Sequence, residues 1–146
     1  MHLNLMPSDP CVCISSRKAA NALTNLYDDA LAKSGIKITQ YSLMKNIHRS
    51  TEITINELAK ETKLNRTTLT RNLAILEKDN LVEIVADDED LRKSIVKLSI
   101  NGQKVLKKAQ ASWEEAQKRA KKILGKDLAY YIELNKKLSE LSLDRV

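Results

Sequence analysis

The stretch from Thr54 to Leu98 is the part of the sequence that most constrains the fold. It holds a short helical segment, a break at Lys63-Leu64, a second helical segment, and then two β-branched runs separated by an acidic turn. Apolar residues recur every three or four positions in the helical segments, and the runs Leu81–Val85 and Ser94–Leu98 have the composition of paired strands. The sequence therefore predicts a helix-turn-helix followed by a two-stranded hairpin, here called the wing.

Helices are also predicted before this unit. The first begins at Ser15 or Ser16 and ends near Ser34-Gly35, because glycine readily adopts the left-handed conformation that closes a helix. The second covers residues 40–48, with Thr39 as its expected N-cap. Ile53 is expected in a short strand that leads into the helix-turn-helix.

Two more helices are predicted after the wing. Ser99 or Asn101 opens a long helix that Gly125 ends, and a last helix covers residues 127–141. The expected fold is mostly α with a small β-hairpin wing, a winged helix-turn-helix with N- and C-terminal dimerisation helices. We divide it into a loose arm (1–10), a helical dimerisation region (11–36 and 100–146) and a winged lobe (37–99).

Composition agrees with one compact subunit. The 146 residues are 42% hydrophobic but only 3% aromatic, and the three glycines and two prolines favour long helices over a turn-rich sheet. The net charge of +6 suits a polyanionic partner. No apolar run approaches the roughly 18 residues of a membrane span, and residues 1–10 lack the Lys or Arg of a signal peptide. We therefore expect a cytoplasmic protein with no membrane partner.

The second helix of the helix-turn-helix has the polar face of a DNA reader. If Leu69, Leu73 and Leu76 face the core, Thr67 and Arg71 point outward. Hydroxyls and arginines near a helix N-terminus can bond base edges and phosphates in a major groove. An ordinary solvated face is the alternative. With the wing included, the candidate DNA-binding residues are Asn65, Arg66, Thr67, Thr68, Thr70, Arg71, Arg92 and Lys93.

The wing combines opposite charges. Its turn holds four acids, Asp87 to Asp90, which repel phosphates, followed by Arg92 and Lys93, which attract them. We expect Asp90 to pair with Arg92 and orient it toward a minor groove, where an inserted arginine is favoured. A solvated hairpin tip is the alternative.

The long helix after the wing carries an apolar seam at spacings of three and four, made of Leu106, Ala109, Trp113, Ala116, Ala120 and Ile123. A single subunit cannot easily cover both this seam and the last helix, so the seam indicates a homodimer. Pairing there would place two recognition helices about one DNA turn, roughly 34 Å, apart. Packing within the same chain is the alternative. The run 118–122 is expected on the wet side of this helix.

These patterns together resemble the MarR family of winged helix-turn-helix regulators over residues 12–142. The resemblance is carried by the segments 39–43, 55–59, 65–73, 76–82, Asp90-Leu91-Arg92-Lys93 and 98–102. It implies a homodimer built from the first, fifth and sixth helices, bound to a palindromic operator, usually as a repressor. Thr67, Thr68, Thr70 and Arg71 match the groove-facing residues of the family, and Arg92 matches its wing arginine. Lys63 departs from the pattern, which often has glycine there.

The resemblance also implies release from DNA by a small phenolic or lipophilic effector or by cysteine oxidation. Cys11 and Cys13 are the thiol candidates, with inert packing as the alternative. A small apolar or phenolic effector would lie where the first, second and fifth helices meet, though each lining candidate also suits a plain core. Those candidates are Tyr27, Tyr41, Met44, His48 and Trp113.

Other functions find less support in the sequence. It contains no Gly-rich phosphate loop, HExxH or GxSxG motif, so we expect no enzyme and no cofactor. Two histidines and two cysteines do not form a zinc-site spacing, so no metal is expected. A winged-helix protein-interaction module without DNA reading remains the alternative. Such a module more often shows apolar anchors where Thr67 and Arg71 stand.

Overall fold

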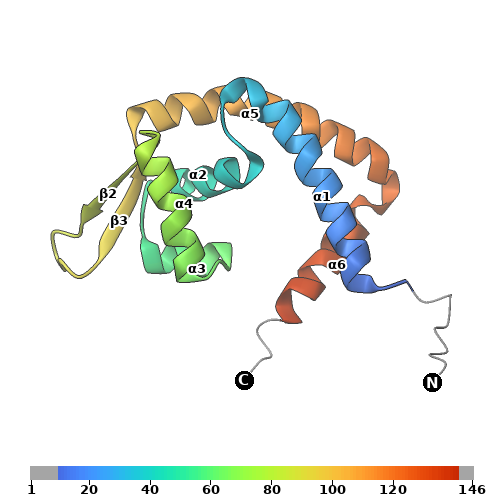
Figure 1. The fold of residues 1–146 in the computed structure, drawn as a ribbon, viewed down its shortest axis with the longest axis horizontal. Coiled ribbons are helices and arrows are strands. Elements are labelled where there is room, and N and C mark those ends of the chain that lie inside the picture. Colours follow the sequence, from blue (N-terminus) through green and yellow to red (C-terminus); the bar gives the residue numbers. More distant parts are fainter. Residues whose placement is uncertain (1–9, 142–146) are drawn as a thin grey trace, which may run out of the picture.

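The computed structural model describes residues 10–141, so most of the expected N-terminal arm and the last five residues lie outside the described part. Helices make up most of the molecule, and a small sheet lies at one end of it, beside α4 (Figure 1). The elements are α1 Val12–Leu31, η1 Ala32–Ser34, α2 Ile38–Arg49, β1 Glu52–Thr54, α3 Ile55–Thr62, α4 Arg66–Lys78, β2 Val82–Ala86, β3 Ser94–Leu98, α5 Ile100–Leu124, η2 Gly125–Asp127 and α6 Leu128–Ser139.

The predicted wing is confirmed, and the strand expected around Ile53 extends it. The strands are antiparallel in the order β1-β3-β2. Val96 in the central strand lies opposite Ile53 on one side and Ile84 on the other, and it is fully buried. The sheet therefore has three strands, because the chain between α2 and α3 covers the edge of β3 that a hairpin alone would leave unpaired.

Side-chain caps begin three of the helices. The Thr54 side chain accepts a hydrogen bond from the Glu57 N–H and starts α3, Asn65 caps α4 in the same way, and Ser99 caps α5. Gly35 has the expected positive φ of 73°, and Gly125 ends α5. Lys63 closes α3 with a φ of 56°, a conformation that costs a non-glycine residue free energy.

Two predicted boundaries of the first helices are wrong. The first α-helix begins at Val12, earlier than Ser15, and ends at Leu31 before a 3-10 turn. Thr39 is not an N-cap, because α2 already begins at Ile38. The Ile38 N–H donates to a carboxylate oxygen of Asp28 at 2.8 Å, so a side chain from the preceding helix satisfies this helix start.

The core of the winged lobe lies between the helices and the sheet. Leu69, Leu73 and Leu76 on α4 are buried as predicted, and they join Leu58 and Met44 in one apolar cluster. Their burial fixes which face of α4 points outward, because the opposite face of the same helix must then face solvent.

Helix α5 connects the lobe to the rest of the chain. Near its start, Gly102 packs closely against the backbone of Leu81, the residue before β2. A Cβ added at Gly102 would lie 1.9 Å from the Leu81 carbonyl oxygen. Further along, Leu106, Ala109, Ala116 and Ala120 are already buried within the single chain, where α1 packs against this helix (Figure 1). For these four residues the structure agrees with the alternative given for the seam, packing within the same chain.

The seam does not extend as far as predicted. Ile123 is 76% exposed, so the described part of the chain leaves this side chain largely uncovered, although Ala120 three positions earlier is buried. Helices α1 and α6 lie toward one end of α5, and the winged lobe lies toward the other (Figure 1). No described helix combines the length and hydrophobicity that a membrane crossing requires.

Candidate nucleic-acid interface

The outward face of α4 is polar and open to solvent. Thr67, Thr70 and Arg71 are exposed, and together with Arg66 and Ala74 they line a shallow depression of about 460 Å³. Asn65 and Thr68 contribute less to this face. Asn65 Oδ1 accepts the Thr68 N–H at 2.8 Å, and the Thr68 side chain is half-buried. Four of the six candidates in the range 65–71 therefore line this depression.

Arg66 joins the helix face to the wing. Its guanidinium donates from Nη1 to Asn56 Oδ1 at 3.0 Å, which holds the Arg66 side chain against α3. Arg66 also lines a narrow cleft with Arg92 and Lys93 from the wing. Arg66 thus meets two cationic side chains that lie 26 and 27 positions later in the sequence around one cleft.

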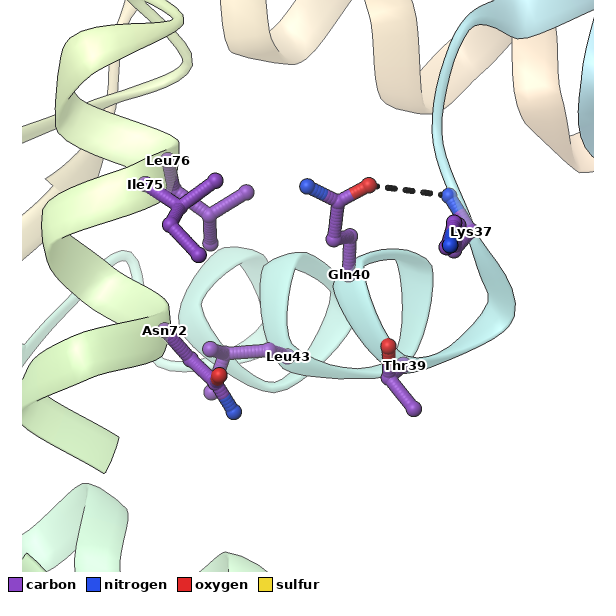
Figure 2. Close-up of a pocket in the computed structure, with 7 residues that line it drawn as sticks. All are labelled: Lys37, Thr39, Gln40, Leu43, Asn72, Ile75 and Leu76. Carbon is purple, nitrogen blue, oxygen red and sulfur yellow. Dashed lines mark hydrogen bonds between the residues drawn. The ribbon is translucent and has the colours of Figure 1, made fainter. Parts of the chain in front are cut away.

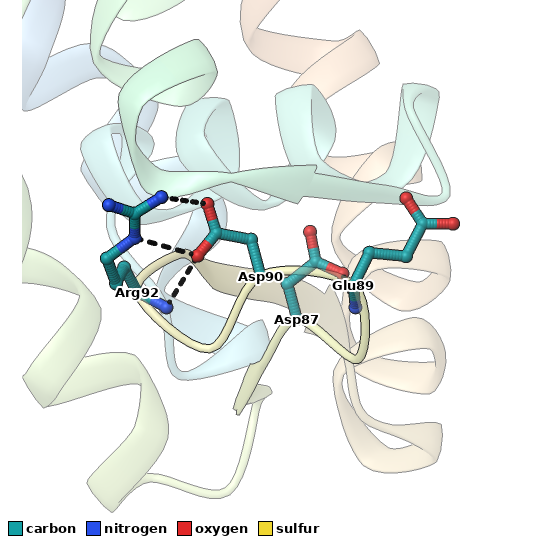
Figure 3. Close-up of polar contacts among 4 residues, drawn as sticks. All are labelled: Asp87, Glu89, Asp90 and Arg92. Carbon is teal, nitrogen blue, oxygen red and sulfur yellow. Dashed lines mark hydrogen bonds and ion pairs between the residues drawn. The ribbon is translucent and has the colours of Figure 1, made fainter.

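The acidic turn organises the wing tip (Figure 3). Asp90 Oδ1 accepts hydrogen bonds at 3.1 Å from both Nε and the backbone N–H of Arg92, and Oδ2 accepts one from Nη2 at 3.4 Å. The expected Asp90–Arg92 pair is present. These hydrogen bonds hold the pKa of Asp90 below its ordinary value. The Arg92 side chain is nevertheless 91% exposed, so it is oriented while remaining available.

A second acid also serves the turn. Asp87 Oδ1 accepts the Glu89 N–H at 3.0 Å, and the Asp87 N–H donates to the Lys93 carbonyl. Asp87 and Asp90 therefore fold the tip that presents Arg92 and Lys93, whereas Glu89 extends away from this pair (Figure 3). The charge conflict seen in the sequence is partly resolved, because two of the four acids bond within the turn.

Three of the five effector-pocket candidates come together. Tyr41 and Trp113 stack with ring centroids 5.9 Å apart, and with His48 they line a cavity of about 600 Å³ between α2 and α5. Sequence reasoning missed Lys45, whose Nζ lies 4.8 Å from the Trp113 ring centroid. Its position four residues after Tyr41 on the same helix was the available signal. Burial, followed by the charge of Glu114, raises the pKa of Tyr41.

The other candidates lie elsewhere. Met44 is fully buried in the core, and the Tyr27 hydroxyl donates to the Gln117 side chain. Cys11 and Cys13 are exposed free thiols at the start of α1. Within residues 10–141, no group of three or more His, Cys, Asp or Glu side chains is placed to hold a metal ion.

Comparison with known proteins agrees with this geometry. The model of the MarR family matches residues 34–93. The structure of the M. tuberculosis transcriptional regulator MosR in complex with DNA is 31% identical, covers 94% of this chain and 100% of that one, and has a TM-score of 0.85. A second structure of M. tuberculosis MosR is also 31% identical, covers 92% of this chain and 95% of that one, and has a TM-score of 0.73.

A more distant structure shows the same fold. A cysteine-to-serine mutant of MarR from E. coli, complexed with operator DNA, is 24% identical, covers 87% of this chain and 92% of that one, and has a TM-score of 0.80. No significant match was found among curated proteins.

Proposed function

Since this chain belongs to the MarR family of winged-helix, DNA-binding transcriptional regulators, we propose that it acts as a homodimeric repressor on a palindromic operator. The family is a class of transcription regulators and not of enzymes. One observation carries the proposal: Arg66 belongs both to the exposed face of α4 and to the cleft that it shares with Arg92 and Lys93. A helix face for the major groove and a cationic wing for the neighbouring minor groove thus form one surface.

In this proposal the residues have separate roles. Thr67, Thr70 and Arg71 contact base edges, because they are exposed on the first turns of α4. Arg66 binds a phosphate from its position beside Asn56. Arg92 and Lys93 enter the minor groove, and Asn65 and Thr68 act indirectly through the helix cap.

Exposed apolar side chains support dimerisation through α1, α5 and α6. None of the described α6 residues is fully buried, and Ile132 is 57% and Leu138 45% exposed. On α1, Val12 is 65% exposed. A monomer would leave these side chains in water, at a cost of about 25 cal/mol per Å² of apolar surface. We therefore assign residues 11–36 and 100–146 to dimerisation and 37–99 to DNA binding.

Two triggers for release are compatible with the structure. A small apolar or phenolic effector would occupy the cavity beside Tyr41 and Trp113, which touches both the lobe and the dimerisation region. Oxidation of Cys11 or Cys13 would instead act at the start of α1, where both thiols are accessible. Replacing both cysteines with serine distinguishes the two: release by oxidant is lost, and release by an effector remains.

Selection of bound duplexes from random DNA tests the proposal. We expect enrichment of an inverted repeat whose half-sites lie about one helical turn apart. Placing the recovered sequence upstream of a reporter should then lower expression when the protein is present. Failure to enrich any sequence would favour the protein-interaction module instead.

A further inference from the structure

Helix α5 carries a line of lysines that has no role in the function proposed above. The helix holds seven cationic residues and only two acids, Glu114 and Glu115, and all nine are exposed. At 3.6 residues per turn, four of the lysines lie within about 40° of the direction opposite the buried face of α5. We call these four residues the α5 stripe: Lys104, Lys107, Lys118 and Lys122.

The α5 stripe is separate from the surface proposed to read the operator. Helix α2 lies between α4 and α5. Its Leu43 points toward Ile75 and Leu76 on the inner face of α4 (Figure 2). On the other side of α2, Tyr41 stacks on Trp113 of α5. The outward face of α4 and the α5 stripe both point away from α2, so they face different directions.

The charges of the stripe are not neutralised within the chain. Its four lysines form no ion pair or hydrogen bond with any residue in the range 10–141. Of the two acids, Glu114 instead accepts a hydrogen bond from Gln110 at 3.2 Å. Like charges three or four positions apart repel along a helix, and the stripe consists of two such pairs, 104/107 and 118/122. A bound polyanion relieves this repulsion, because its negative charges attract both members of a pair.

Neither a partner subunit nor a lipid surface suits the stripe. Burying unpaired cations is unfavourable, and lysine is depleted from protein interfaces. The exposed apolar side chains that favour dimerisation lie instead on α1 and α6, among them Val12 and Ile132. A helix that lies in a membrane surface buries large apolar side chains, and none between positions 104 and 122 is exposed.

The spacing of the stripe matches the two backbones of a DNA duplex. Lys107 and Lys118, the nearest members of the two pairs, are eleven residues apart, which is about 16 Å along the helix axis. The major groove is about 12 Å wide, so each pair can reach phosphates on one side of it. The section with Ala111, Glu114 and Glu115 then spans the groove opening, away from the phosphates. An anionic membrane, whose charge is continuous, offers no match to this interruption.

We propose that the α5 stripe binds the phosphate backbones of a second DNA duplex, independently of its sequence, while the outward face of α4 holds the operator. Each subunit of the proposed dimer carries one stripe, so an operator-bound dimer can join two segments of DNA. The joining of two segments rests on the proposed function, whereas the binding of DNA by the stripe does not.

Capture of a second duplex by an operator complex tests the stripe. The selected operator duplex is immobilised, saturated with the full chain and washed, and a labelled duplex without operator sequence is added at low salt. We expect saturable capture. If all four lysines of a stripe contact phosphates, the slope of log affinity against log salt is about −3.6.

The stripe variant combines Lys104→Gln, Lys107→Gln, Lys118→Gln and Lys122→Gln. Glutamine has nearly the helix propensity of lysine, so α5 is retained. We expect capture of the second duplex to weaken at least about tenfold and operator affinity to change less than about twofold. A control variant loses the same charge at four exposed lysines outside the stripe, and it should keep capture within about threefold. Its substitutions are Lys33→Gln, Lys126→Gln, Lys136→Gln and Lys137→Gln.

Four outcomes would overturn the stripe as a DNA-binding surface. They are no capture by the unsubstituted chain, equal capture by the stripe variant, an equal loss in the control variant, and tighter binding to phosphatidylserine vesicles than to the second duplex. If selection from random DNA yields no operator, the proposed function fails by itself. Binding of the labelled duplex alone then tests the stripe, and a tenfold loss in the stripe variant sustains it.

Discussion

Replacement of Arg71 by alanine separates DNA reading from fold stability. The Arg71 side chain is exposed and makes no hydrogen bond or ion pair with other residues in the range 10–141. Alanine is also the best helix former. We therefore expect the free energy of unfolding to change by no more than about 0.5 kcal/mol.

The expected loss of DNA affinity is much larger. A bidentate contact of arginine with a base contributes about 1–3 kcal/mol, and a dimer on a symmetric operator loses two of them. The sum of about 2–6 kcal/mol corresponds to a decrease of about 30-fold to more than 10,000-fold. A phosphate contact would behave differently, because losing one per subunit also lowers the slope of log affinity against log salt by about 1.8.

Fluorescence anisotropy with the selected duplex at several salt concentrations measures both quantities. Lys108→Ala is the matched control, since Lys108 is an exposed cation on α5 outside the proposed surface. We expect it to change the affinity less than about threefold. The assignment of α4 as the DNA-reading helix would be refuted if Arg71→Ala bound the duplex within twofold of the unsubstituted chain. It would also be refuted if Lys108→Ala lost as much DNA affinity as Arg71→Ala.

Three further predictions concern assembly, packing and charge. Ile132→Glu should convert the dimer to a monomer in sedimentation velocity, because it puts a charge into an apolar surface that is 57% exposed in the single chain; an intact dimer would place the interface elsewhere. Gly102→Ala should lower the free energy of unfolding by at least about 1–3 kcal/mol in denaturant titration, since its Cβ would meet the Leu81 oxygen at 1.9 Å; stabilisation, as helix propensity alone predicts, would contradict the close approach. The bonds from Arg92 lower the pKa of Asp90 below its ordinary 3.8, so the stability that this pair gives the wing is complete above that value and is lost as pH falls through the lowered pKa. A carboxyl titration followed by NMR with its midpoint at or above 3.8 would exclude the pair in solution.

Local rules of the sequence were sufficient for the helix-turn-helix and the wing. The spacing of Leu69, Leu73 and Leu76 set the buried face of α4, and the same periodicity placed Thr67 and Arg71 outside. Caps such as Asn65 mark a helix start because their hydrogen bonds reach only three residues along the chain. Family resemblance was visible for the same reason, since these short segments follow one another in a fixed order.

Predictions that depended on residues far apart in sequence were less successful. Asp28 satisfies the start of α2 from ten positions away, so Thr39 was chosen wrongly as the N-cap. Lys45 was missed because its partner Trp113 lies on another helix. Ile123 matches the spacing of the seam, but periodicity states only which face a residue shares and not whether anything covers that face.

The order of the elements, the outward face of α4 and the charged wing follow from the amino-acid pattern, because each depends on contacts between near neighbours in the chain. The folded chain was needed to see that Arg66 meets Arg92 and Lys93 around one cleft, and that Tyr41 and Trp113 stack beside a cavity. Those meetings depend on how the helices and the sheet cross, which is set by the packing of the whole core.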